Sequence, residues 1–93
     1  MKSIILDEKK YNVIKDYRDG FDSEALLARY TDYFHPYDYV LGDWSYGKLR
    51  LKGFYKKDNK NCRELNNFEN IDNYLKTNCA FEARHFVIEK DIE

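Results

Sequence analysis

The chain has 93 residues, a formal net charge of −1, 43% apolar residues and 35% charged residues, which is typical of one well-solvated domain. No run of apolar residues approaches the ~20 needed to span a bilayer, which argues against an integral membrane protein. Residues 4–6 are too short an apolar run for a secretion signal, so we expect a cytoplasmic protein that does not act on a membrane.

Cysteine and histidine spacing gives no sign of a metal site. Cys62, Cys79, His35 and His85 fit neither a zinc-ligand pattern nor a disulfide framework. We therefore expect reduced thiols, no metal and no cofactor. His85 falls within a predicted strand, where a packed or surface histidine is commoner than a catalytic base.

Two strands are predicted at the start of the chain. Residues 4–6 are a short apolar run, and residues 11–17 alternate between apolar and polar side chains. This alternation predicts that Tyr11, Val13 and Tyr17 share one face of the sheet.

A helix is expected after the Asp-Gly turn that ends the second strand. Asp22 is a good N-cap, and Phe21 and Leu26 have the spacing of a hydrophobic staple. Apolar side chains at helical spacing continue to Phe34, and Pro36 ends the helix. The predicted apolar stripe comprises Leu26, Leu27, Tyr30, Tyr33 and Phe34.

The second half of the chain predicts a hairpin, a loop, a helix and a strand. The hairpin spans residues 37–55, and residues 56–67 form a polar, basic loop. Asn70 can cap a helix over residues 71–78, and a last strand covers residues 83–89.

The resulting element order is ββαββαβ, an α+β fold. We expect a mainly antiparallel sheet with two helices on one face. A ferredoxin-like split-βαβ arrangement is the leading topology for the later elements. The additional first strand leaves another sheet order open.

The hairpin register follows from its glycines. Gly47 suits the left-handed position of a three-residue loop over residues 45–47, which pairs Trp44 with Lys48. In this register Tyr39 covers the bare backbone of Gly53. One face, expected to be the core, then carries Tyr37, Tyr39, Leu41, Leu49, Leu51 and Tyr55. The other face carries Trp44, Lys48, Arg50, Lys52 and Phe54 around a flat spot at Gly42.

The same hairpin carries a family resemblance. Residues 37–54, YDYVLGDWSYGKLRLKGF, resemble the YutD-like family of small bacterial proteins of unknown function. Residues 15–21 with 28–30, and residues 86–88, are also similar to the family pattern. The resemblance implies a single α+β domain over residues 1–93 and a cytoplasmic location. It implies no established activity, so no catalytic residue is carried over.

Charge is unevenly distributed along the chain. Residues 44–63 hold seven cations against Asp58 alone, a net +6, while the remainder of the chain carries −7. Such a basic lobe attracts anionic partners. The cations of this segment are Lys48, Arg50, Lys52, Lys56, Lys57, Lys60 and Arg63.

The leading functional hypothesis is a non-catalytic binding module. Its binding face would comprise Trp44, Tyr46, Lys48, Arg50, Lys52 and Phe54, with RNA, single-stranded DNA or an acidic protein as partner. The plainer interpretation is that these cations only keep an exposed sheet face soluble.

Two alternatives belong to other classes. Trp44 and Tyr46 could anchor a protein–protein interface, since aromatic residues dominate such interfaces. Asp19 and Asp43 could support a small enzyme or ligand site if they lie close together. No nucleophile–base pair is recognisable in the sequence, which favours a non-catalytic role.

Overall fold

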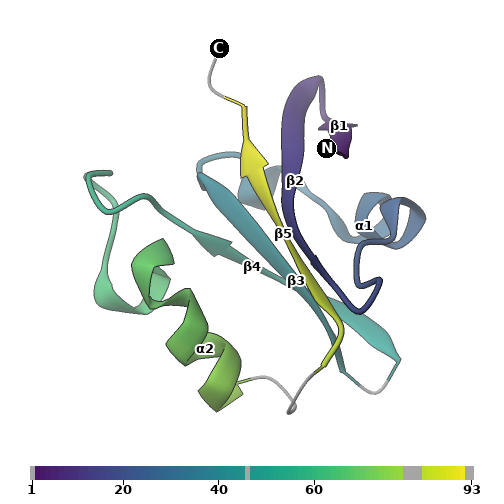
Figure 1. The fold of residues 1–93 in the computed structure, drawn as a ribbon. Helices are drawn as coiled ribbons and strands as arrows, with labels where there is room; N and C mark the ends of the chain where they lie inside the picture. Colours follow the sequence, from purple (N-terminus) through teal and green to yellow (C-terminus); the bar gives the residue numbers. More distant parts are fainter. Residues whose placement is uncertain (1, 46, 79–82, 92–93) are drawn as a thin grey trace.

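The structure, a computed structural model, describes residues 2–45, 47–78 and 83–91. In this part of the chain five antiparallel strands form one sheet in the order β1-β2-β5-β3-β4 (Figure 1). The strands are β1 (Ser3–Leu6), β2 (Lys9–Tyr17), β3 (Tyr39–Ser45), β4 (Lys48–Phe54) and β5 (His85–Lys90). The helical elements are α1 (Ser23–Arg29), η1 (Asp32–Phe34), η2 (Glu64–Asn66), η3 (Phe68–Asn70) and α2 (Ile71–Asn78).

The α+β class and the predicted order of strands and helices are confirmed. The ferredoxin-like arrangement is wrong, because it would place β4 between β2 and β3, whereas β5 lies there and β4 forms the edge of the sheet. The alternative sheet order is the correct one. No helix in the described residues is long and apolar enough to cross a membrane.

Strand β5 occupies the centre of the sheet, and both of its faces are buried. Phe86 and Ile88 point to one side and Val87 to the other, as the two-residue period of a strand requires. Its neighbours are β2 and β3, which are distant from β5 in sequence. A strand in this position needs apolar cover on both faces.

The two helices supply that cover from opposite sides, so the expectation that they share one face is wrong (Figure 1). Leu26 of α1 packs in the core cluster that contains Phe86 and Ile88. Helix α2 packs against Val87 on the other face. The residues of this second cluster are Leu41, Phe54, Val87, Tyr39, Phe68, Ile71, Tyr74 and Leu75.

A β-bulge in β2 changes which side chains share a face. Val13 pairs with Ile88 and Lys15 with Val87, so the register shifts at Ile14. Tyr17 therefore lies on the α2 face beside His85, whereas Tyr11 and Val13 lie on the α1 face, and the prediction that all three share a face is wrong.

Helix α1 begins as predicted and ends earlier. The Asp22 carboxylate accepts from the Ala25 N–H at 3.2 Å, which confirms the N-cap. Tyr30 leaves the helix in an extended conformation, and its hydroxyl lies 2.8 Å from that of Tyr11. Thr31 then caps η1. The long apolar stripe is thus divided between a helix and a short 3-10 turn.

Helix α2 lies where the sequence predicts it, but its entry differs from the prediction. Asn70 ends η3, and its side-chain amide donates to the Glu64 carbonyl oxygen at 3.1 Å. Asn67 is the residue whose side chain caps η3, by accepting from the Glu69 N–H at 2.9 Å.

The hairpin register differs from the predicted one by a single residue. Ser45 pairs with Lys48 and Trp44 with Leu49, which leaves only residues 46–47 between the strands. Gly47 has a φ of +76°, as expected, whereas Tyr46 lies outside the described residues.

Because the shift is one residue, the predicted core face and cationic face are both wrong. Tyr39 and Leu41 lie on the α2 face, together with Lys48, Arg50, Lys52 and Phe54. Trp44, Leu49, Leu51 and Tyr37 pack into the α1-side core.

Two strand glycines make room for rings. A Cβ at Gly42 would fall within the ring of Phe86, so the expected flat spot is filled. A Cβ at Gly53 would fall within the ring of Tyr37, which covers this glycine in place of Tyr39. These close approaches require glycine at both positions.

Candidate functional site

Three cations project from β4 on the face of the sheet that α2 covers. Lys48, Arg50 and Lys52 are each two residues apart, so the strand places them on one side. β4 is the outermost strand beside β3, which lets long side chains reach solvent past the sheet edge. We call Lys48, Arg50 and Lys52 the cationic row.

Arg50 is oriented by a buried carboxylate. Its Nε donates to Asp43 Oδ1 at 2.8 Å, and its Nη2 donates to Asp43 Oδ2 at 3.2 Å. The Asp43 side chain is 4% exposed and that of Arg50 is 49% exposed. This two-point contact offsets the cost of burying the carboxylate and holds the guanidinium at the protein surface.

Lys52 lies over aromatic rings. Its Nζ is 5.3 Å from the ring centroid of Phe54 and 5.6 Å from that of Tyr74 of α2. Phe54 is only 1% exposed, so it supports the lysine from within the core. It presents almost no ring surface to an incoming ligand.

Trp44 lies on the opposite face from the cationic row. Its indole N–H donates to the Gly20 carbonyl oxygen at 2.8 Å. The Arg84 guanidinium lies 4.6 Å from its ring, and the side chain is half-buried. The expected grouping of Trp44 with Lys48, Arg50 and Lys52 on one face is therefore wrong, and Tyr46, its predicted companion, is outside the described residues.

The two aspartates of the alternative site, Asp19 and Asp43, lie in different environments. Asp19 lies in a turn with a φ of +55°, and its backbone oxygen accepts from Arg84 Nη2 at 2.9 Å. The Asp43 carboxylate is bound by Arg50, as described above. Each aspartate thus has a structural role, as turn residue and as ion-pair partner.

A row of polar side chains crosses four strands, and sequence analysis did not predict it. Tyr17, His85, Asp43 and Arg50 are successive cross-strand partners on β2, β5, β3 and β4. The Tyr17 and His85 rings stack with centroids 4.9 Å apart. His85 Nδ1 lies 3.0 Å from the Ala83 oxygen, and its buried Nε2 has no hydrogen-bond partner among the described residues.

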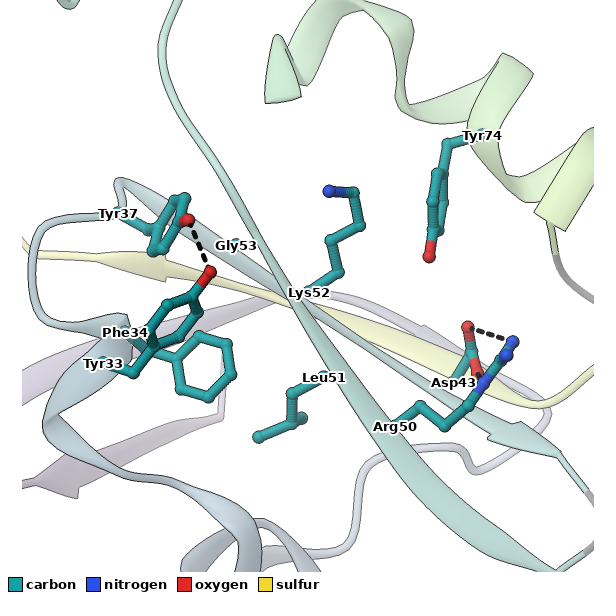
Figure 2. A pocket seen from close by; sticks show the side chains of 9 residues that line it. All are labelled: Tyr33, Phe34, Tyr37, Asp43, Arg50, Leu51, Lys52, Gly53 and Tyr74. Carbon is teal, nitrogen blue, oxygen red and sulfur yellow. Dashed lines mark hydrogen bonds and ion pairs between the residues drawn. The ribbon is translucent and has the colours of Figure 1, made fainter. Parts of the chain in front are cut away.

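A pocket of about 310 Å³ opens across the edge of β4 (Figure 2). Tyr33, Phe34 and Tyr37 stand on one side of the strand, and Tyr74 stands on the other beside Lys52 and Arg50 (Figure 2). The Tyr33 and Tyr37 hydroxyls are 3.2 Å apart. This hydrogen bond, with partial burial, raises the pKa of Tyr37 to about 12, so the hydroxyl stays protonated at neutral pH.

The described residues offer no metal centre. No three His, Cys, Asp or Glu side chains gather in residues 2–45, 47–78 and 83–91 in a way that could hold an ion. Cys62 is a half-buried free thiol, and Cys79 lies outside the described residues.

Three comparisons show what the chain is similar to. A family model described as "Putative antitoxin YutD-like" matches residues 5–89. A curated relative, "Putative antitoxin YutD" of Bacillus subtilis (strain 168), is 36% identical over 87 residues, which cover 94% of this chain and 96% of the relative. The solution NMR structure of protein yutD from B. subtilis is 33% identical, with a TM-score of 0.82, and the match covers 100% of this chain and 84% of that one.

Proposed function

This chain belongs to the YutD-like family, and on that premise we propose that it is a non-catalytic binding module that captures an acidic partner protein at its cationic row. Its relatives are described as "Putative antitoxin", which supports this choice. A protein antitoxin neutralises its toxin most directly by binding it. The partner would accordingly be a toxin protein with an acidic surface.

One observation carries the proposal: the cationic row is held in place at an open sheet edge. Asp43 fixes Arg50, and two rings support Lys52. Cations fixed before binding lose less conformational entropy when a partner arrives. Complementary charge also speeds encounter and rejects partners of the wrong sign.

The positions of the aromatic rings favour protein over nucleic acid as the partner. A single-stranded nucleic acid is held by cations together with exposed rings on which its bases stack. Trp44 lies on the other face, and Phe54 is buried, so neither expected ring lies open beside the row.

The test is depletion of the protein in the bacterium that encodes it. We expect growth arrest, relieved by loss of one other gene, whose product binds the purified chain. Lys48→Glu/Lys52→Glu should fail to restore growth, because reversed charge repels an acidic surface. Lys9→Glu/Lys15→Glu, which changes two exposed cations of β2, is the matched control and should restore growth.

Two results would overturn the proposal. Normal growth after depletion would remove the antitoxin role. Binding of labelled RNA or single-stranded DNA at low salt, abolished by the same row variant and kept by the control, would assign the row to nucleic acid.

A further inference from the structure

The outer edge of β4 carries backbone groups that point away from the sheet. Trp44 N–H donates to the Arg84 carbonyl oxygen at 3.1 Å, so the even-numbered residues of β3 bond to β5. The odd-numbered residues of β3 therefore bond to their even-numbered partners in β4. It follows that Leu49, Leu51 and Gly53 direct their N–H and C=O groups outward.

The chain itself pairs with this edge at one point, where Asn67 lies in an extended conformation between η2 and η3. Tyr55 follows in the same outward series, and its N–H donates to the Asn66 oxygen at 2.7 Å. Its carbonyl oxygen accepts from the Phe68 N–H at 3.0 Å, which forms a parallel bridge to residue 67. Among the described residues, no backbone hydrogen bond outside the sheet involves Leu49, Leu51 or Gly53.

Leu51 is partly exposed and borders an open pocket with two different sides, whereas Leu49 and Gly53 are themselves buried. The pocket across β4 lies at residues 50–53, with the rings of Tyr33 and Tyr37 on one side (Figure 2). Tyr33 is 64% exposed, so an apolar surface is available there. The other side presents the cationic row.

We propose that an extended segment of the partner protein adds to the sheet beside residues 49–53, with acidic side chains over the cationic row and apolar side chains over Tyr33 and Tyr37. Successive side chains of a strand point to opposite faces, so a segment alternating between acidic and apolar residues meets both surfaces at once. This inference rests on the proposed function and specifies how the partner is recognised.

A second copy of the chain is a poor occupant of the same edge. Pairing β4 with another β4 would bring the lysines of both copies to one edge, and edge lysines generally oppose such pairing. An acidic strand relieves this repulsion, so the row selects against self-association as well as for the partner.

The probe is a synthetic peptide of about seven alternating valine and glutamate residues, which spans residues 49–53 at ~3.3 Å per residue. Amide exchange followed by NMR should show the N–H groups of Leu49, Leu51 and Gly53 slowed about tenfold or more at saturating peptide. The amides of Arg50 and Lys52, already bonded to β3, should change little.

The matched control is the same peptide with N-methyl groups on alternate amides. Methylation of the amides that face β4 should weaken binding about tenfold per blocked bond, whereas methylation of the opposite amides should leave it unchanged. A valine–lysine peptide should not bind. Lys48→Gln/Lys52→Gln should weaken binding and reduce its dependence on salt.

Three outcomes overturn the inference. They are no binding at low salt, binding that is indifferent to which amides are methylated, and a β4–β4 dimer of the chain that the peptide cannot displace. These outcomes are distinct from failure of the proposed function. If depletion arrests growth and the toxin binds while the outward amides stay unprotected, the function stands and strand addition is wrong.

Discussion

Gly47 is the residue on which the hairpin turn depends. Its φ is +76°, and among the described residues, apart from Gly47 and its chain neighbours, no atom lies within 4 Å of the position that a Cβ would occupy, so backbone conformation determines which residue fits. Gly47→Val should lower the free energy of unfolding by about 1–2 kcal/mol, because a β-branched residue strains at positive φ. Urea denaturation measures the loss. Gly47→Asn, which tolerates this region, should cost much less, and equal midpoints for the Val variant and wild type would contradict the assignment.

The Arg50–Asp43 pair predicts coupled effects on stability. Arg50→Leu should destabilise the fold by about 1–3 kcal/mol, because it removes two donors from a buried carboxylate. Asp43→Asn in that background should recover part of the loss by removing the charge. A double-mutant cycle measured by thermal unfolding gives the coupling energy. Strictly additive effects would show that the pair contributes nothing as a pair.

Among the secondary-structure elements, α1 is short enough for its cap to matter. Asp22→Ala should cost about 1 kcal/mol, because the Ala25 N–H loses its acceptor. Asp22→Asn keeps an oxygen acceptor and should be close to neutral. Chemical denaturation of both variants measures the cost. An Ala variant as stable as wild type would mean that water accepts from the Ala25 N–H as well as the Asp22 carboxylate does.

Element positions could be predicted from the sequence, whereas the faces of the hairpin could not. The predicted register assumed that both helices cover one side of the sheet, so only one face of the hairpin was expected to be core. In the structure both sides are covered, by α1 and α2, and Tyr39 and Leu41 pack as well on one side as Leu49 and Leu51 do on the other. Apolar alternation cannot select a register when both faces are apolar.

Tertiary contacts also decided where local patterns ended. Tyr30 continues the helical apolar stripe in sequence, yet it leaves α1 to bond the Tyr11 hydroxyl. The bulge at Ile14 has no signal in the sequence and moves Tyr17 to the other face. Because of it, the polar row through His85 and Asp43 could not be foreseen. Thr31 was a recognisable cap signal for η1 that the long stripe obscured.

The cationic row was partly predictable from the sequence. The two-residue spacing of Lys48, Arg50 and Lys52 places them on one face in any register, and the structure confirms that grouping. The predicted face of Trp44 depended on the predicted register, and both were wrong. The partner for Arg50 came from a cross-strand pair that only the correct register reveals.

At the scale of the whole molecule, buried tyrosines predict loss of stability in alkali. Partial burial raises the pKa of Tyr30 and of Tyr11, and burial next to Glu89 raises the pKa of Tyr39 to about 12. The unfolded chain releases these protons near pH 10. Above pH 10 the unfolded state therefore binds fewer protons than the folded state, so the free energy of unfolding falls as pH rises.

Absorbance of the ionised phenol during a pH titration tests this prediction. The stabilisation should be complete below pH 10 and should be lost progressively as pH approaches 12. The late-titrating tyrosines should ionise together with unfolding followed by circular dichroism. Tyr30→Phe should reduce by one the number of protons that are released only at high pH. Ionisation of every tyrosine near pH 10 in a folded protein would contradict the prediction.

The central position of β5 has a consequence for synthesis. This strand comes after the other four in the chain, yet it joins the β1–β2 hairpin to the β3–β4 hairpin. Until residues 85–90 leave the ribosome, the nascent polypeptide holds two hairpins without the strand that joins them into one sheet. We expect the sheet to stay open until β5 joins it. Ribosome-bound chains should therefore stay protease-sensitive until β5 emerges from the exit tunnel.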